Sequence, residues 1–232
     1  MKKASLVIDK TYASIYKTYQ LELAKNNSVD FDDLLLLPLK IFEENKKILS
    51  KYQNLWKYIL VDEYQDTNMP QFKLVKYLSG DHQQVCVVGD DDQSIYGWRG
   101  AEVRNILDFK KLFDNCEVFK LEKNYRSTGN ILDAAISVVK NNENRASKKL
   151  SSNSGAGNKL GLIETNDELE EADAVINALE KEIKLDKRNF SDFAILYRTN
   201  AQSRALEDAF RRSGIPYNIV GGVRFYDRKE IK

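Results

Sequence analysis

Apolar residues in the first half of the chain follow two patterns, helical spacing and short continuous runs. The helical spacing predicts a helix over residues 9–26 and a second over 31–52, capped by Asp30 and kinked or broken at Pro38. The continuous runs predict short buried strands with further helices between them. These strands are expected at 58–61, 85–88 and 118–121, and the helices at 68–78, 102–113 and 128–141.

The second half of the chain repeats this alternation after a polar break. Residues 141–158 are rich in Asn, Ser, Lys and Gly, and we expect an exposed loop there. Strands are then predicted at 160–163, 193–197 and 217–220, and helices at 167–185 and 201–213. The alternation of strands and helices predicts two α/β units with parallel sheets and a seam within residues 122–130.

Composition narrows the class of protein. The 232 residues carry 36 Lys and Arg against 35 Asp and Glu, a formal charge of +1, which argues against a histone-like or an acidic disordered chain. Two cysteines, Cys86 and Cys116, cannot form a disulfide framework. The longest apolar run, residues 34–37, is too short to span a membrane. We therefore expect a cytoplasmic protein without a membrane partner.

Two adjacent carboxylates, Asp62 and Glu63, follow the predicted strand 58–61. In parallel sheets, ligands bind beyond the carboxyl ends of the strands. One carboxylate at that place can hold Mg²⁺, and its neighbour can take a proton from an attacking water. Pairs of this kind are common, however, and a pair taken alone more often simply begins a solvated loop.

A longer polar segment, residues 89–101, follows the next predicted strand. It starts with three consecutive aspartates, which need solvent or a cation, and Gln93 beside them can sense a phosphate oxygen or a water. Tyr96, Trp98 and Arg99 form an aromatic and cationic cluster of the kind that stacks bases and contacts phosphates of single-stranded nucleic acid. In the alternative interpretation, both aromatic residues belong to the core and the arginine pairs with an acid.

A third segment, residues 121–128, lies just past a predicted strand and just before a predicted helix. Its Tyr125 can stack on an adenine while Arg126 contacts a terminal phosphate. Ser127 or Thr128 can cap the helix that follows, and capping does not exclude the first role.

Taken together, these segments resemble the superfamily 1 DNA helicases of the UvrD/PcrA/Rep type. The similarity is to the family's Walker B motif at residues 62–68, to its third motif at 89–101 and to its fourth at 124–127. Residues 30–34, 196–204 and 221–225 are also typical of the family. The resemblance implies an α/β fold with RecA-like parallel sheets flanked by helices, in parts of two RecA-like domains.

The resemblance also implies ATP and Mg²⁺ as cofactors, with a role for each matching residue. Asp62 would hold Mg²⁺, with Glu63 beside it as a further metal contact and as the general base for the attacking water. Gln93 would couple the γ-phosphate to the DNA site. Tyr125 would stack on adenine, and Arg126 would neutralise charge on the γ-phosphate in the transition state.

On the DNA side, the resemblance assigns Tyr96, Trp98 and Arg99 to contacts with single-stranded DNA. Members of the family move 3′ to 5′ and unwind duplexes, so the implied partners are single-stranded DNA and junctions of single- and double-stranded DNA. The implied setting is DNA repair or replication, and no particular protein partner is predicted.

One departure from the family pattern concerns the P-loop, G-x-x-x-x-G-K-[ST]. None of the 11 glycines is followed by lysine. We therefore expect an internal fragment of such a helicase that is inactive alone. In this interpretation residues 1–27 end an inserted helical subdomain, 28–126 are the second half of the first RecA-like domain, and 127–232 are the first half of the second.

Two alternatives stay open at this point. Helicase subunits linked to nucleases in recombination complexes are related, but they usually differ in the third motif, and Trp98 in residues 89–101 favours the UvrD-type branch. A protein of another class, a non-catalytic binding module, would have kept the DNA-stacking cluster and lost ATPase activity.

Overall fold

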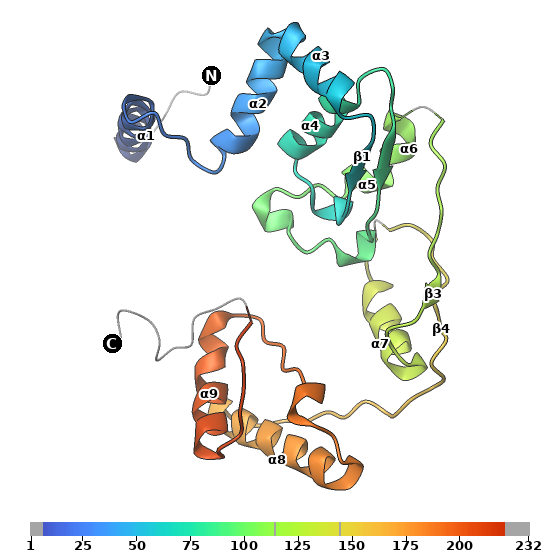
Figure 1. Ribbon diagram of the computed structural model, residues 1–232. Helices are drawn as coiled ribbons and strands as arrows, with labels where there is room; N and C mark the ends of the chain where they lie inside the picture. The colour runs from blue at the N-terminus through green and yellow to red at the C-terminus, as the bar shows by residue number, and fades with distance from the viewer. Residues whose placement is uncertain (1–6, 114, 144, 221–232) are drawn as a thin grey trace. The chain divides into compact units, whose positions relative to one another are not determined.

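The computed structural model describes residues 7–113, 115–143 and 145–220, and the predicted motif at 221–225 lies outside them (Figure 1). The chain divides into two compact units, residues 1–158 and 159–232. It is a mixed α/β protein with small parallel sheets flanked by helices. Within the described ranges, no helix combines the length and the apolar character needed to cross a membrane.

Three helices open the first unit: α1 (Val7–Lys25), α2 (Asp33–Glu44) and α3 (Lys46–Leu55). The predicted helix 9–26 is confirmed by α1, and Asp30 accepts from the Asp33 backbone N–H at 2.9 Å at the start of α2. Of the two outcomes expected at Pro38, a kink or a break, the break does not occur, because Pro38 lies inside α2. The helix is instead interrupted at Asn45, whose extended backbone and side chain cap α3.

The first sheet pairs two short parallel strands, β1 (Ile59–Val61) and β2 (Val85–Val87), in the register Ile59 to Val85. Helix α4 (Met69–Ser79) connects them, and a capping box between Asn68 and Gln71 begins it. The core beside this sheet consists of Tyr64, Val75, Phe109 and Phe113. These three elements confirm the predictions for residues 58–61, 68–78 and 85–88.

The rest of the first unit differs in part from prediction. The expected helix 102–113 is two short helices, α5 (Arg104–Leu107) and α6 (Phe109–Leu112). The expected strand 118–121 is not formed, and its apolar side chains are exposed. A second parallel sheet instead joins β3 (Lys123–Asn124) to β4 (Ser151–Ser152), so the predicted loop 141–158 contains a strand. Helix α7 (Gly129–Val139) lies between them in sequence.

The second unit is built on two helices, α8 (Glu168–Asp186) and α9 (Ser203–Arg212), as predicted. Asp167 caps α8 by accepting from two backbone N–H groups, and Gly214 follows α9 with a φ of +66°. The core between them is Ala172, Ile176, Leu179, Ala209, Phe210 and Ile215. The strands expected at 160–163, 193–197 and 217–220 are not formed within residues 159–220.

Short 3-10 helices complete the described elements, at Tyr64–Asp66, Asp91–Gln93, Gly97–Arg99, Phe190–Asp192 and Asn200–Gln202. The first three directly follow β1 and β2 along the chain. They shape the loops that carry the candidate chemistry.

Candidate functional site

The loops after β1 and β2 lie side by side. Pairing continues beyond the strands, because Val88 donates its N–H to Val61 at 2.8 Å and Tyr64 donates its N–H to Val88 at 2.9 Å. The segment that carries Asp62 and Glu63 therefore lies against the segment that starts at residue 89. Because β1 and β2 are parallel, both segments lie at the carboxyl end of this sheet, where ligands bind in parallel sheets.

Glu63 has a left-handed backbone, with φ +51° and ψ +41°. For a residue with a Cβ this conformation costs about 1–3 kcal/mol, and such strain is concentrated at functional sites. Two contacts hold the turn: Asp62 Oδ1 accepts from the Glu63 N–H at 2.9 Å, and Gln65 Nε2 donates to Glu63 Oε2 at 2.8 Å. The Glu63 carboxylate is thus exposed to solvent but fixed in direction.

Gln65 connects this carboxylate to the second loop. Its side chain is buried, with 1% of the residue exposed, and its Oε1 accepts from the Asp90 N–H at 3.0 Å. Its backbone oxygen accepts from the Ser94 hydroxyl at 3.2 Å. At Gly89, an added Cβ would lie 2.4 Å from Gln65 Oε1, so only glycine permits this approach. Gln65 is not among the residues predicted from the sequence, where its only signal was its place inside the motif 62–68.

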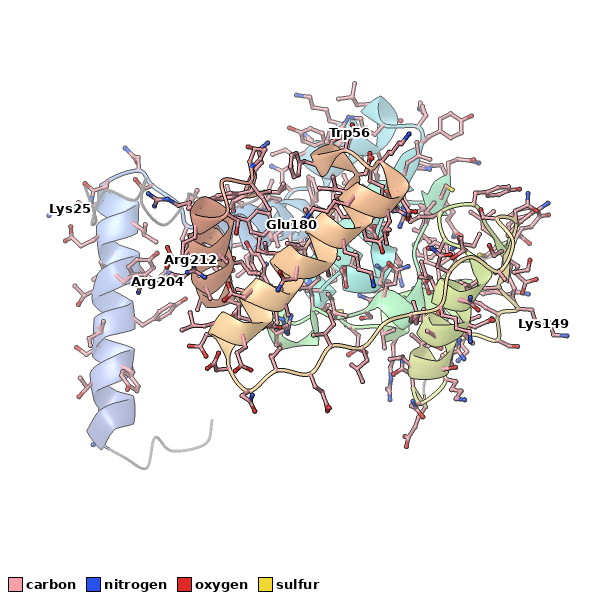
Figure 2. All side chains as sticks on the ribbon, turned by 90° about the horizontal axis from the view of Figure 1, so that it is seen from below. Lys25, Trp56, Lys149, Glu180, Arg204 and Arg212 are labelled. Atoms are coloured by element: carbon pink, nitrogen blue, oxygen red, sulfur yellow. The ribbon has the colours of Figure 1, made fainter. Side chains whose placement is uncertain are left out.

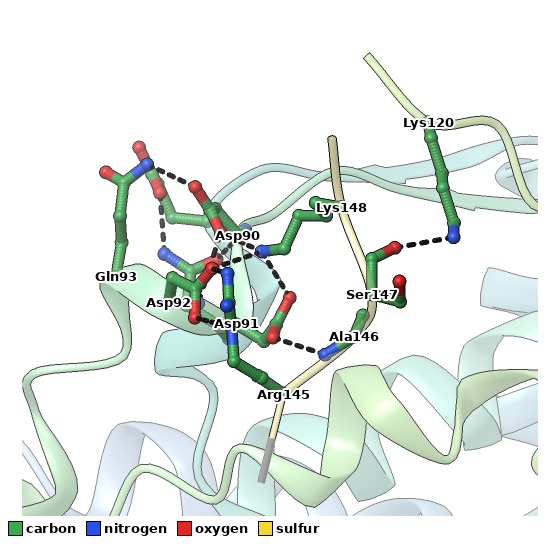
Figure 3. A network of polar contacts seen from close by, with 11 residues as sticks. Asp90, Asp91, Asp92, Gln93, Lys120, Arg145, Ala146, Ser147 and Lys148 are labelled. Atoms are coloured by element: carbon green, nitrogen blue, oxygen red, sulfur yellow. Dashed lines mark hydrogen bonds and ion pairs between the residues drawn. The ribbon is translucent and has the colours of Figure 1, made fainter. Parts of the chain in front are cut away.

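The three aspartates are met by cations, one of the two outcomes expected for them. Lys148 contacts all three carboxylates, and Arg145 pairs with Asp92 (Figure 3). Burial alone would raise the pKa of Asp90, but hydrogen bonds from Lys148 and Gln93 outweigh it and leave that pKa below its ordinary value. Burial would also raise the pKa of Asp92, and the two cations again lower it on balance.

The aromatic cluster is open to solvent. Trp98 is 69% exposed and Tyr96 is 39% exposed, which contradicts the interpretation of both as core residues. The Arg99 guanidinium carbon lies 4.5 Å from the Trp98 ring centroid and 5.4 Å from that of Tyr96. Among the described residues Arg99 forms no ion pair with an acid, so its contacts are with the rings. Such a surface is suited to stacking a base and contacting a phosphate.

The third segment presents Tyr125 and Arg126 at the surface, with Tyr125 71% exposed. Lys123 Nζ lies 5.7 Å from the centroid of the Tyr125 ring. Asn124 Oδ1 shapes the turn by accepting from the N–H groups of Arg126 and Ser127, at 3.0 and 2.8 Å. No hydrogen bond or ion pair in the described part of the chain joins the Tyr125 or Arg126 side chains to the first two loops.

The predicted side-chain cap of the helix after this segment is wrong. Thr128 occupies the N-cap position of α7, but its side chain makes no capping hydrogen bond. The first N–H groups of the helix donate instead to backbone oxygens of Gly155 and Ala156, at 2.7 and 2.9 Å. Residues close in space but distant in sequence therefore replace the local cap.

The carboxylates of Asp62 and Glu63 suit Mg²⁺ that is bound together with a nucleotide, and do not suit Mg²⁺ held by protein ligands alone. No group of three or more His, Cys, Asp or Glu side chains that suits a metal occurs within the ranges that the structure describes. Asp62 and Glu63 are both exposed at the strand end. Mg²⁺ bound with a nucleotide takes one or two carboxylates and completes its shell with phosphate oxygens and water. The donor set fits that mode and does not fit a cage made of protein ligands.

The α/β fold and the motifs in its strand-end loops agree with the families whose models match the sequence. The family described as UvrD/REP helicase N-terminal domain matches residues 2–114, and the UvrD-like helicase C-terminal domain matches residues 119–232. The chain belongs to the UvrD/Rep helicase family.

Particular relatives are similar over the whole chain. The ATP-dependent DNA helicase PcrA of Staphylococcus epidermidis is 48% identical over 231 residues, which is 100% of this chain and 32% of the relative. The protein of the same name from Bacillus subtilis is 48% identical over 231 residues, covering 31% of its own length. The chain therefore spans about a third of the length of these curated relatives.

Proposed function

We propose that residues 1–232 are the central part of an ATP-dependent DNA helicase that moves 3′ to 5′ along single-stranded DNA and opens duplexes at single-strand junctions. The observation that carries this proposal is the hydrogen-bonded path from the Glu63 carboxylate through Gln65 to Asp90. It links the proposed catalytic base directly to the loop that bears the proposed DNA contacts.

That loop is anchored at both ends on the segment after β1. Its start is held by Gln65, and its end is held where Ala101 bridges Asn68 and Glu102 donates its N–H to the Thr67 oxygen at 3.0 Å. The exposed aromatic cluster lies between these anchors. A shift caused by DNA at the cluster is therefore transmitted to the ATP side through a short, tethered piece of chain.

At the ATP side, the residues act through their ordinary chemistry. Bound Mg²⁺ supplies neutralisation of phosphate charge, and Asp62 with Glu63 would hold it. Glu63 accepts the proton of the attacking water, and the hydrogen bond from Gln65 keeps its carboxylate directed. Gln93 presents an exposed amide whose N–H group donates to the γ-phosphate and whose oxygen accepts from the attacking water.

The third segment completes the nucleotide site in this proposal. Tyr125 stacks on the adenine through its exposed ring, and Arg126 neutralises charge that develops on the γ-phosphate. Both side chains project from the turn that Asn124 fixes. The two stretches on either side of this segment are taken to belong to different RecA-like domains.

The proposed division keeps residues 1–27 as the end of an inserted helical subdomain, 28–126 as part of the first RecA-like domain and 127–232 as part of the second. We place the protein in the cytoplasm, in DNA repair or replication, with ATP and Mg²⁺ as cofactors. The proposed compartment rests on the cysteine count, because two cysteines cannot form a disulfide framework.

The experiment uses a chimera in which residues 1–232 replace the matching third of Bacillus subtilis PcrA, the relative that is 48% identical over this region. We expect ATP hydrolysis that is stimulated by single-stranded DNA and is abolished by Glu63→Gln. A folded chimera without such hydrolysis, next to active Bacillus subtilis PcrA, would refute the proposed motor function.

A second candidate is a non-catalytic module that binds single-stranded DNA. The exposure of Trp98 beside Arg99, in a chain whose 11 glycines include no P-loop pattern, favours it. The two candidates are distinguished by the same chimera. Single-strand binding by the 232-residue chain, combined with an inactive chimera, would support the binding module.

A further inference from the structure

A cluster of five charged side chains ties the loop after β2 to a segment far away in sequence. The loop contributes Asp90, Asp91 and Asp92, here called the acidic turn, and the distant segment contributes Arg145 and Lys148 (Figure 3). The ion-paired residues are 53 to 58 positions apart in sequence. All five lie in the first compact unit.

Lys148 is the centre of the cluster. Its ammonium contacts Asp91 at 2.6 Å and Asp92 at 3.2 Å, and it makes its shortest contact with Asp90. Arg145 binds Asp92 through two nitrogens, Nε at 2.9 Å and Nη2 at 2.7 Å. The Ala146 N–H adds a hydrogen bond to Asp91 at 2.7 Å. Two cations therefore neutralise two of the three negative charges.

Burial makes this cluster different from an ordinary surface ion pair. The side chains of Asp92 and Asp91 are 6% and 7% exposed, and that of Lys148 is 15% exposed. Exposed pairs contribute little to fixing a structure, because water screens them and their side chains stay mobile. Shielded charges with several partners are held in one geometry, and loss of one partner leaves the others buried and unpaired.

The cluster acts on Gln93 through Asp90. One carboxylate oxygen of Asp90 contacts Lys148, and the other accepts from Gln93 Nε2 at 2.8 Å. The first oxygen also accepts from the Asp92 N–H at 3.1 Å, which closes the turn. The direction of the Gln93 amide therefore depends on a carboxylate that Lys148 holds in place.

The positive charges of Lys148 and Arg145 also affect Gln93 electrostatically. Without Lys148 and Arg145, three carboxylates next to Gln93 would repel the phosphates that Gln93 is proposed to sense. The two half-buried cations reduce this repulsion and leave Gln93 itself exposed to the ligand.

We propose that Lys148 and Arg145 are positioning residues for Gln93: they hold the acidic turn so that the Gln93 amide meets the γ-phosphate of ATP. This inference rests on the proposed function, because it takes phosphate sensing by Gln93 from there. The cations lie in the region matched by the C-terminal family domain and the turn in the region matched by the N-terminal one. The contact therefore makes the sensor of one domain depend on a segment of the other.

The first part of the test needs no activity. In the ¹⁵N-labelled 232-residue chain, the Gln93 side-chain amide is observed by NMR in Lys148→Met, Lys148→Arg and Lys149→Met. Lys149 is the matched control, because its side chain points away from the rest of the first unit (Figure 2). We expect the Gln93 side-chain signals to move to the values of an amide that has lost its hydrogen bond to Asp90, and to do so in Lys148→Met alone. Unchanged Gln93 signals in that variant would overturn the proposal.

The second part measures ATP hydrolysis in the chimera with Bacillus subtilis PcrA. Lys148→Met is expected to lower kcat roughly 10- to 100-fold, as the loss of a supporting contact does, with the KM for ATP nearly unchanged. Lys148→Arg should restore most of the rate, and Lys149→Met should match the parent. An unchanged kcat in Lys148→Met, or no rescue by arginine, would contradict the positioning role.

If Lys148→Met does not fold, Arg145→Gln is used in both parts of the test. The Arg145→Gln substitution removes the contact of Arg145 with Asp92 and leaves Lys148 in place. If the parent chimera hydrolyses no ATP, the proposed function is refuted and sensing by Gln93 with it. The NMR experiment then still decides whether the cations hold the acidic turn.

Discussion

Replacing Trp98 with alanine separates a DNA contact from a structural role. The residue is 69% exposed, so only about a third of it is shielded by the protein. Truncation of a fully buried tryptophan costs about 3–5 kcal/mol. A third of that, plus about 0.5–1 kcal/mol for the contact with Arg99, predicts a loss of about 1.5–2.7 kcal/mol in stability. The corresponding fall in melting temperature is about 3–11 °C.

The expected loss in DNA affinity is large by comparison. Stacking of a base on an aromatic side chain is worth about 1–3 kcal/mol, or roughly 5- to 150-fold in affinity. We would measure fluorescence anisotropy of a labelled single-stranded oligonucleotide and the melting temperature on the same Trp98→Ala preparation. Trp56→Ala is the control, because Trp56 is the other tryptophan and packs on Tyr52 outside the proposed DNA surface.

The result that would refute this reasoning is a fall in melting temperature well beyond about 11 °C together with unchanged affinity per folded molecule. Trp98 would then support the structure and not the DNA. A loss of affinity of the same size in Trp56→Ala would also contradict the assignment, because it would show a general effect of removing a tryptophan.

Three further predictions concern the ATP side and the ion cluster. The 232-residue chain alone should hydrolyse ATP negligibly with or without single-stranded DNA, because no P-loop amides or lysine are present in its sequence to anchor the triphosphate. In the chimera, Glu63→Gln should lower kcat at least about 10²-fold and leave ATP binding largely intact, because the amide cannot accept a proton. The ion cluster should make the stability of the fold depend on pH. The pKa values of Asp90 and Asp92 are lowered by folding, so the ionised carboxylates stabilise the fold above pH 3.8, and this stabilisation is lost as the pH falls further. The pKa of Lys148 is raised by folding, so its ammonium stabilises the fold below pH 10.5. The stability difference between parent and Lys148→Met should thus be constant from about pH 5 to 9 and shrink in more acidic solution.

A coupled ATPase assay on the purified 232-residue chain tests the prediction of negligible hydrolysis. DNA-stimulated turnover at an ordinary helicase rate would contradict that prediction. Near-parental turnover of Glu63→Gln would remove Glu63 as the base. Urea unfolding of parent and Lys148→Met at several pH values tests the cluster, with Lys149→Met as control. A difference that stays the same at pH 3 as at pH 7 would show that the carboxylates are not its source.

The sequence predicted correctly what depends on local pattern and strand direction. The strand-end positions of Asp62 and of residues 89–101 followed from the apolar runs before them, and the parallel pairing of β1 with β2 places both loops at one edge. The amphipathic helices of the second unit were also found, since helical spacing is a local property.

The features that were predicted wrongly or not at all depend on contacts between residues far apart in the sequence. The apolar runs at 118–121, 160–163, 193–197 and 217–220 predicted strands, but a strand needs neighbours to pair with, and in the described part of the chain none pairs with them. Leu196, for example, is 93% exposed. Likewise, the run of aspartates indicated a need for solvent or a cation but did not identify Lys148, which lies 58 residues from Asp90.

Single-turnover unwinding by the chimera with Bacillus subtilis PcrA tests the central claim most directly. The substrates are two duplexes of equal length, one with a 3′ single-stranded tail and one with a 5′ tail. We predict that ATP and Mg²⁺ allow the chimera to open the 3′-tailed duplex and not the 5′-tailed one, and that Glu63→Gln prevents both. If the folded chimera opens neither duplex under conditions in which Bacillus subtilis PcrA opens the first, residues 1–232 are not the core of a DNA helicase.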